Sequence, residues 1–396
     1  MTLPLPLVEG TDYAINAYQG MVTLTEALAP TVNFDGGLIS ANPLGDQIAN
    51  LVVTYEYTPI TAQASTLNYG LRGEAWINEN LRVGVSEQRV TTGLQTLDSR
   101  GIDVFARADD QTWINIEAAQ SRGQGYDNST SLNGGYDIDA ATPAGGSSDY
   151  AQAIDITAQM DLARVGANGT ASAYYQTRDQ GFVSADYDTK IGQRTYGVAA
   201  DLVTDNATTV RLSYDHFDNA DGAKTDTLGI GVQRQVNDTD HLDVEVQGER
   251  VTTPNSTADD SNGNRTNVAV KYTRRWNDSD EIWVLAQGTL AQTGNMTRQG
   301  RLTVGGSRSL DDQNTVSGQI STDRAAELTW SRRIDDSTTD TLGYRLNPAD
   351  STVANGTNRG TLVAGATSQV NEKWQYTAEI PIPRFQINRP MDPITA

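Results

Sequence analysis

The chain has 396 residues, of which none is cysteine and only two are histidine. The absence of thiols excludes a disulfide frame, a thiolate metal site and a cysteine nucleophile. Lys and Arg number 29 against 50 Asp and Glu, which gives a formal net charge of −21. Because phosphate binding needs a basic surface, this shortage of positive charge argues against a nucleic-acid partner and favours cations as counter-charge.

Long apolar runs are missing as well. No stretch of about 18 apolar residues occurs, so the sequence predicts no transmembrane helix. The opening residues 1–6 are uncharged and rich in proline, which does not fit a signal peptide, so we expect that any export leader has been removed. Hydrophobic residues make up 37% of the chain and are spread evenly, which disfavours a large conventional core.

What the sequence does contain is strict alternation of apolar and polar residues, the pattern of a β-strand with two unlike faces. In residues 67–77, Leu67, Leu71 and Ile77 share one parity, whereas Arg72 and Glu74 occupy the other. The pattern recurs along the chain, at 81–85, 102–106, 114–118, 154–162, 196–202, 210–214, 228–232, 242–246, 268–272 and 342–346.

The connections between these strands fall into two kinds. Tight turns rich in Asn and Asp, which tolerate left-handed backbone and cap their own turns, are predicted near residues 78–80, 109–111, 204–206, 237–240, 277–280, 311–314, 335–337 and 371–373. Longer polar segments are predicted at 123–149, 254–265 and 347–360. Short turns at one end and long loops at the other are typical of outer-membrane barrels.

We therefore predict an all-β fold, a closed antiparallel transmembrane β-barrel of roughly 16 to 20 strands in the outer membrane of a Gram-negative bacterium. Closure is implied because an open edge in lipid would leave backbone groups without partners. The expected organisation is an N-terminal extension or first strand region over residues 1–45, the barrel over 46–380, and a Pro-rich tail over 381–396.

Full charges occupy the polar parity of the predicted strands, where a dry core could not accept them. We expect these side chains to line a wet lumen. The candidates are Arg72, Glu74, Arg82, Asp103, Arg107, Glu117, Arg211, Asp243, Glu245, Lys271 and Arg345.

Two other kinds of site are disfavoured. His216 stands beside Asp215 at a strand end, but the other histidine, His241, falls in a turn at the opposite end and no Gly-x-Ser-x-Gly elbow occurs, so we predict no catalysis. The acidic segments 215–222 and 259–263 resemble calcium loops, yet Phe217 and Ala258 stand where a first aspartate is required. Solvated turns are favoured, and no metal or cofactor is predicted.

The alternating segments at 69–76, 100–108 and 359–366 resemble the C-terminal barrel of large proteobacterial outer-membrane surface proteins, which are similar to TonB-dependent receptors. The resemblance covers about residues 50 to 375 and rests on hairpin patterns. Such a receptor carries a globular plug ahead of its barrel, whereas only about 45 residues precede the first confident strand, so the resemblance implies a barrel without a plug. Family barrels also end in a strand with a terminal aromatic residue, and this chain ends instead in a proline-rich stretch.

These observations predict a passive diffusion pore or a membrane anchor with a charged lumen, whose partners are outer-membrane lipid and lipopolysaccharide and small polar solutes or ions. The long segment 123–149 is the expected constriction of the pore. The alternative is a soluble extracellular β-rich adhesion or structural protein with acidic loops. Aromatic residues, at 7%, are few for a barrel with two aromatic girdles, which favours the alternative.

Overall fold

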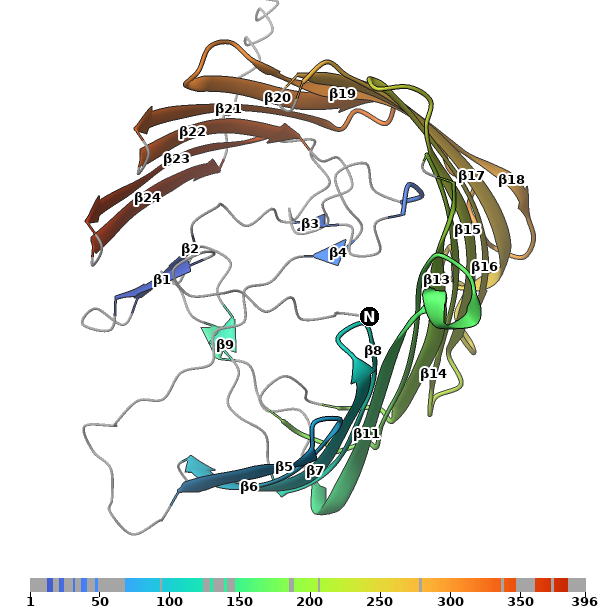
Figure 1. Ribbon diagram of the computed structural model, residues 1–396, viewed down its shortest axis with the longest axis vertical. Helices are drawn as coiled ribbons and strands as arrows, with labels where there is room; N and C mark the ends of the chain where they lie inside the picture. The colour runs from blue at the N-terminus through green and yellow to red at the C-terminus, as the bar shows by residue number, and fades with distance from the viewer. Residues whose placement is uncertain are drawn as a thin grey trace, which may run out of the picture.

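The computed structural model is a single large curved sheet that surrounds an inner space (Figure 1). It describes residues 13–16, 21–24, 31–32, 37–40, 47–48, 68–92, 95–123, 129–130, 139–140, 147–184, 189–205, 207–277, 280–335, 338–346, 360–371 and 374–383. No helix among them is long and apolar enough to span a membrane.

Eighteen strands form the sheet, in the order β5 to β8 and then β11 to β24. Their bounds are β5 (Tyr69–Asn78), β6 (Leu81–Thr92), β7 (Gln95–Asp109), β8 (Thr112–Gly123), β11 (Ser147–Asp161), β12 (Gly169–Arg178), β13 (Gln193–Asp205), β14 (Thr208–Asn219), β15 (Lys224–Gln235), β16 (Asp240–Thr252), β17 (Asn262–Arg275), β18 (Glu281–Gln292), β19 (Gly300–Ser309), β20 (Asn314–Ser321), β21 (Ala326–Asp335), β22 (Thr338–Leu346), β23 (Gly360–Asn371) and β24 (Trp374–Pro383).

Shorter elements accompany the sheet. Three two-stranded ribbons pair β1 (Tyr13–Asn16) with β2 (Met21–Leu24), β3 (Thr31–Val32) with β4 (Gln47–Ile48), and β9 (Ser129–Thr130) with β10 (Asp139–Ala140). The 3-10 helix η1 (Leu162–Val165) joins β11 to β12, capped by Asp161 before it and by Gly166 after it.

The strand order is that of a closed barrel, with β24 next to β5. Every other neighbouring pair is joined by an antiparallel register, including β8 with β11 across the long connection 124–146. The place where the two ends of the sheet meet therefore lies between β5, its first strand, and β24, its last. The all-β antiparallel barrel sheet predicted from the alternation is confirmed, and the number of strands falls within the predicted range. Closure between β24 and β5 stays a prediction, because no register joins these two strands among the described residues.

The two ends of the barrel differ as predicted. At one end, the turn end, each connection from β5–β6 to β23–β24 is short, and η1 belongs to the longest of them. At the other, the loop end, lie the long connections 124–146, 179–192 and 347–359, although β14–β15 and β20–β21 are also joined by tight turns there. Because β5 starts and β24 finishes at the loop end, the segments that flank the barrel join it at that end.

One prediction about this end is wrong. The acidic segment 215–222 was expected to be a loop, but β14 continues to Asn219 and only residues 220–223 form the turn. The strand extends because His216, Phe217 and Asp218 all pair in register with residues of β13, Phe217 with Thr195. The expected constriction at 123–149 lies mostly outside the described residues.

The turn end shows why Asn and Asp occupy these turns. The carboxylate of Asp311 accepts hydrogen bonds from the backbone N–H groups of Gln313, at 2.8 Å, and Asn314, at 2.7 Å. These bonds to the charged form lower the pKa of Asp311 from its ordinary value, with the Gln313 N–H as the largest cause. A side chain that bonds its own turn in this way fixes the register of the two strands that the turn joins.

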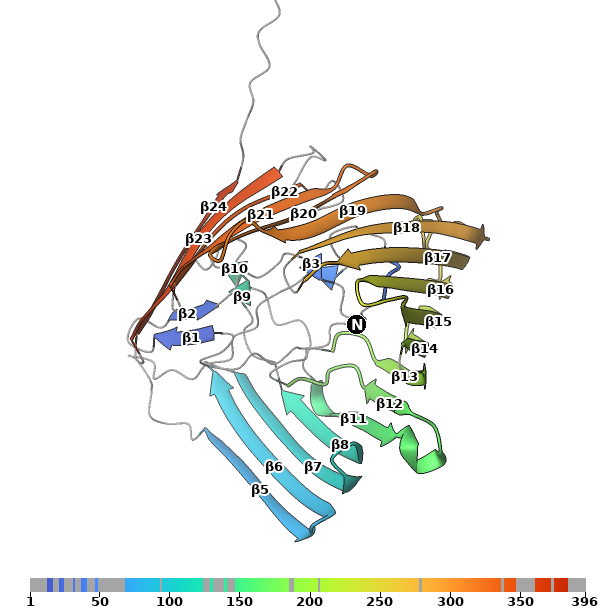
Figure 2. The same ribbon diagram turned by 45° about the horizontal axis from the view of Figure 1, so that its top comes forward.

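The sheet has two unlike faces, and their polarity is inverted relative to a soluble protein. The inner space holds β3 (Figures 1 and 2) and β4 (Figure 1), and the face toward it is called the inner face. Leu71 and Ile102, on the outer face, are 66% and 60% exposed, whereas Asp103 and Arg301, on the inner face, are 6% and 8% exposed. Water would penalise this arrangement, since it exposes apolar area and buries charge.

The apolar part of the outer face is a band with charged borders. On β15 and β16 the neighbouring pairs Val232–Val244 and Ile230–Val246 lie in its middle. Asp226 and Arg250 form the next polar pair toward the loop end, and Arg234 stands at the turn end. An apolar band with charged rows at both borders matches the hydrocarbon layer of a bilayer and its two headgroup regions.

We predict that Ile230→Arg reduces the free energy of unfolding from lipid vesicles by roughly 2–4 kcal/mol, because it places a charge in the middle of the band. The measurement is denaturant unfolding of the refolded protein, followed by the heat-dependent shift of the folded band on a gel.

Gln247→Arg is the matched control, since Gln247 lies on the inner face beside Val246. It should have little effect. Equal losses in the two variants would show that the outer face is not in contact with lipid.

Candidate functional site: the charged inner wall

The inner wall carries the sequence-predicted residues at the parity opposite to the exposed apolar side chains. All the candidates, from Arg72 on β5 to Arg345 on β22, occupy inner register positions. The structure brings some of them together and separates the others.

Arg72, Glu74, Arg82 and Asp103 form one cluster on β5, β6 and β7. Asp103 is the centre, with its Oδ1 3.2 Å from Arg72 Nη2 and its Oδ2 3.7 Å from Arg82 Nη2. Glu74 Oε2 lies 3.6 Å from Arg72 and 3.7 Å from Arg82. Asp103 is buried while its partners are more open, so the two guanidinium groups stabilise a carboxylate that is shielded from solvent.

Gly84 makes room for this cluster. It stands directly opposite Asp103 in the β6–β7 register, and a Cβ at this position would lie 2.2 Å from Asp103 Oδ1 and 2.7 Å from Asp103 Cγ. Any larger residue would have to displace the carboxylate from its two arginines. The glycine is therefore a steric requirement of the ion cluster.

The other candidates lie apart from this cluster. Arg211 pairs with Asp201, Nε to Oδ1 at 2.8 Å, and Arg345 with Glu327 at 3.8 Å. At the turn end, Arg107 lies over the Trp76 ring at 5.1 Å and pairs with Asp110 at 3.2 Å. Glu117 accepts a hydrogen bond from the side-chain amide of Asn115 at 2.9 Å. Lys271 lies over the Trp283 ring at 5.0 Å, and Asp243 stands opposite Lys271 in the register of β16 and β17.

A tetrapeptide ahead of the barrel, Gly37 to Ser40, docks on the inner wall. Glu245 Oε2 accepts from the Leu38 N–H at 2.6 Å. Gln287 accepts from the Ser40 N–H at 3.2 Å and donates to the Ser40 carbonyl at 2.8 Å. Arg301 Nη2 donates to the Ser40 carbonyl at 3.1 Å and to its hydroxyl at 2.7 Å.

The packing around this tetrapeptide is close. Ser40 is buried, and so are Gln287 and Arg301 beneath it. A Cβ on Gly37 would lie 3.2 Å from Glu245 Oε1. Most of these bonds are made to backbone atoms, so the wall holds the tetrapeptide mainly by its main chain, with the small residues Gly37 and Ser40 allowing close approach.

Two connections at the loop end also fold onto the inner wall. The Val183 N–H, in the β12–β13 connection, donates to the buried hydroxyl of Ser121 at 2.8 Å. In the β18–β19 connection, Arg265 Nη1 donates to the Thr297 carbonyl at 3.3 Å, and Met296 is buried. Together with the tetrapeptide, these segments occupy space that an empty barrel would leave to water.

The sequence analysis missed Arg265 and Arg301, the most buried arginines of the wall. Arg265 pairs with Glu249 at 2.7 Å and Asp260 at 2.9 Å, and Arg301 with Asp323 at 3.6 Å. Arg265 fell in an expected loop, residues 254–265. Arg301 precedes the alternating Leu302, Thr303 and Val304, a pattern that would have identified it.

His216 lies on the outer face near the loop end. Its Nδ1 is 2.7 Å from Asp226 Oδ1, its Nε2 is 3.0 Å from Asp218 Oδ2, and its ring stacks on Tyr196 at 4.6 Å. Both ring nitrogens are thus engaged by carboxylates, which does not leave one as a general base. Within the described ranges no group of His, Cys, Asp and Glu could hold a metal ion.

Comparison with known proteins finds similarity to solved structures alone. No family model and no curated protein matches the chain. Among solved structures, it is similar to the ferric enterobactin receptor PfeA of Pseudomonas aeruginosa, at 9% identity and a TM-score of 0.38, over 77% of this chain and 71% of that one. It is also similar to the ferric-catecholate import receptor Fiu of E. coli K12, at 12% identity and a TM-score of 0.41, over 77% and 66%. These scores are too low for a ligand or an activity to be taken from either receptor.

We predict that Gly84→Ala lowers the free energy of unfolding by roughly 1–3 kcal/mol, because the new methyl group displaces Asp103 from its arginines. Gly248→Ala is the control, since a Cβ there has no heavy atom within 4 Å. Denaturant unfolding in the same detergent compares the two variants. A loss at Gly248 as large as that at Gly84 would contradict the steric role of Gly84.

We predict that cysteines introduced at Ser40 and Gln287 are joined by a short thiol-to-thiol cross-linker in the folded protein. The natural chain has no cysteine, so the labelling has no background. Ser40→Cys with Ser86→Cys, on the inner face of β6, is the control pair. Mass spectrometry of the digested product detects the link, and equal yields from both pairs would show that the tetrapeptide has no fixed position.

Proposed function

We propose that this protein is an integral outer-membrane barrel through which small polar solutes or ions pass by diffusion along a narrowed, charged lumen. The observation that carries the proposal is the inverted polarity of the sheet, in which exposed apolar side chains face outward and charged side chains face inward. Only a solvent of hydrocarbon outside and water inside favours both faces at once.

The location follows from the architecture. A sheet whose outer face meets lipid must bond all its backbone groups. The antiparallel pairing from β5 to β8 and on through β11 to β24 supports such an arrangement. Even-numbered antiparallel barrels with short turns at one end belong to the bacterial outer membrane, with the turns in the periplasm and the longer loops outside. By this rule the loop end of this barrel faces the exterior.

The mixed charge of the wall supports passage of small polar solutes. Barrels of 16 to 18 strands leave an aqueous channel unless other segments fill it. Here the wall offers both signs of charge in neighbouring groups, such as the Asp103 cluster and the Arg211–Asp201 pair. The paired arrangement disfavours strong selection for one sign of ion and favours a weakly selective path.

A membrane anchor with a filled lumen is the second candidate. The observation that favours it is the docking of the Gly37 to Ser40 tetrapeptide, together with the inward connections at Val183 and Met296. The two candidates differ in whether water and ions can cross the barrel while the tetrapeptide is bound.

We predict that the purified protein gives stepwise currents in planar bilayers, and that the double variant Gln287→Ala with Arg301→Ala gives larger steps. The double variant removes the side chains that hold the backbone and hydroxyl of Ser40, so the tetrapeptide leaves the wall and the path widens.

Arg211→Ala is the control, because it also removes an inner arginine but one that pairs with Asp201. It should leave the step size close to that of the natural protein. Silent bilayers with well-folded protein, for both the natural chain and the double variant, would favour the anchor. A chain that stays monodisperse in plain buffer would contradict both candidates and favour the soluble β-rich alternative.

A further inference from the structure

The outer face of β5, β6, β7, β8 and β11 changes from apolar to charged within three neighbouring rows. The first row is apolar and consists of Gly73, Val85, Ile102, Ala118 and Ile154. The next row toward the loop end consists of Leu71, Glu87, Arg100, Gln120 and Gln152. The third consists of Tyr69, Arg89, Asp98 and Arg122. The border of the hydrocarbon layer therefore falls between the first and third rows.

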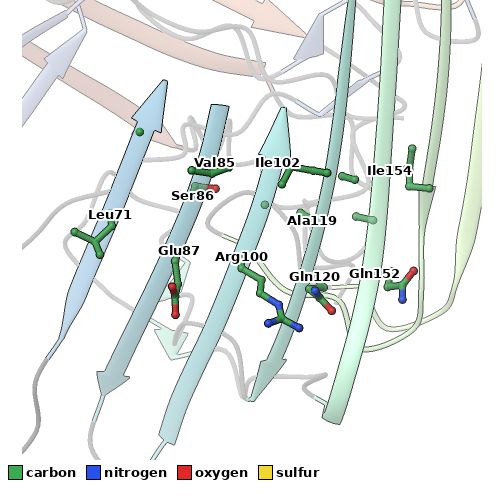
Figure 3. Close-up of a pocket in the computed structure, with 14 residues that line it drawn as sticks. Leu71, Val85, Ser86, Glu87, Arg100, Ile102, Ala119, Gln120, Gln152 and Ile154 are labelled. Carbon is green, nitrogen blue, oxygen red and sulfur yellow. The ribbon is translucent and has the colours of Figure 1, made fainter. Parts of the chain in front are cut away.

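A groove of about 610 Å³ crosses this border on the outer face. Figure 3 shows Val85, Ile102 and Ile154 toward one end of the groove and Arg100, Gln120 and Gln152 toward the other. The small residues Gly73 and Ala118 leave it open between the larger side chains. A groove with this polarity matches a lipid, which has an apolar chain and a polar headgroup.

Two guanidinium groups, that of Arg100 in the groove and that of Arg122 in the next row, stack on one aromatic ring at its polar end. Arg100 and Arg122 each lie over the Tyr150 ring, at 4.7 Å from its centroid. When the side-chain amide of Gln120 is oriented with its oxygen toward Arg100, that oxygen accepts hydrogen bonds from Arg100 Nε at 2.6 Å and from Arg100 Nη2 at 3.0 Å. Stacking on an aromatic ring fixes a guanidinium group without neutralising its charge.

The second and third rows carry one more positive than negative charge, since Arg89, Arg100 and Arg122 stand among Glu87 and Asp98. Asp98 pairs with both Arg89, at 3.6 Å, and Arg122, at 3.1 Å. Arg100 is exposed, and within the part of the chain that the structure describes its contacts include no carboxylate within 4.0 Å. A local surplus of arginine is notable in a chain with a net charge of −21.

A second charged group on the outer face near the loop end lacks such a surplus. On β13 to β15, Arg194 pairs with Asp218, and His216 lies between Asp218 and Asp226. Its carboxylates already balance its cations, so it offers little to an anion. The groove on β5 to β11 is therefore the site where an anionic headgroup gains most.

We propose that this groove binds lipopolysaccharide, a phosphorylated lipid, with a phosphate group on Arg100 and Arg122 and an acyl chain along Val85, Ile102 and Ile154. The inference rests on the proposed function, because it requires the loop end to meet the outer leaflet. Arginine suits a phosphate group because its planar fork donates two parallel hydrogen bonds to the oxygens.

The test is lipid binding to refolded, lipid-free protein in detergent, measured by native mass spectrometry with titrated lipopolysaccharide. We expect Arg100→Gln to weaken binding roughly tenfold, since it removes a charge-assisted hydrogen-bonding group. Arg100→Lys should fall between the natural protein and Arg100→Gln, because it keeps the charge and loses the fork. Arg234→Gln, which removes an outer-face arginine at the turn end, is the matched control and should bind like the natural protein.

Two further ligands identify what is recognised. Dephosphorylated lipopolysaccharide should bind about as weakly to the natural protein as the intact lipid binds to Arg100→Gln. Inorganic phosphate should not compete at concentrations equal to those of the lipid, because it lacks the acyl chain. Equal binding by Arg100→Gln and Arg234→Gln, or full competition by inorganic phosphate, would overturn the proposal.

The folded state of each variant is checked by the heat-dependent shift on a gel, so that loss of binding is not confused with loss of folding. The outcome is also separate from that of the proposed function. If the protein needs detergent and conducts ions, but the Arg100→Gln variant binds lipid as well as the natural protein does, only the lipid site is contradicted. If the natural protein is soluble in plain buffer, the proposed function itself is contradicted.

Discussion

The structure depends on the requirement that backbone N–H and C=O groups be hydrogen-bonded wherever water cannot reach them. In a layer of hydrocarbon, each unpaired group costs several kcal/mol. Antiparallel pairing on both sides meets this requirement for β6 to β8 and for β11 to β23. Once the backbone is paired in this way, the two-residue period of a strand sends alternate side chains to opposite faces, and the polarity of each face is decided by what it meets.

The inner wall shows how a barrel accommodates many charges in a confined space. The carboxylate of Asp103 is shielded from solvent, but it lies between two guanidinium groups, and Gly84 leaves the space that it needs. Arg301 is equally buried, and part of its hydrogen bonding is completed by a segment from far earlier in the chain, at Ser40. Charge, residue size and a docked peptide therefore act together, and the same contacts that stabilise the wall also narrow the lumen.

Much of the wall could be predicted from alternation alone. Arg72, Glu74, Arg82 and Asp103 stand at polar parities of clearly alternating strands, so both their face and their neighbourhood follow from the sequence. Where local composition favours turns, the prediction fails: the acidic residues up to Asn219 were assigned to a loop, yet β14 continues because cross-strand pairing with β13 outweighs the local preference for turns. Arg265 was missed for the same reason, since its neighbours are rich in Asn, Ser and Asp.

The sequence by itself determined the face on which the residues of the clearly alternating strands lie, because the period of a strand is local and needs no knowledge of the neighbouring strands. It also determined the positions of most tight turns, through Asn and Asp side chains that bond their own backbone. Only the tertiary structure decided which strands become neighbours across the long connection between β8 and β11, and that Leu38 and Ser40 reach Glu245 and Gln287. These partners are more than 200 residues apart in the chain, and such contacts are decided by how the barrel closes and not by any local pattern.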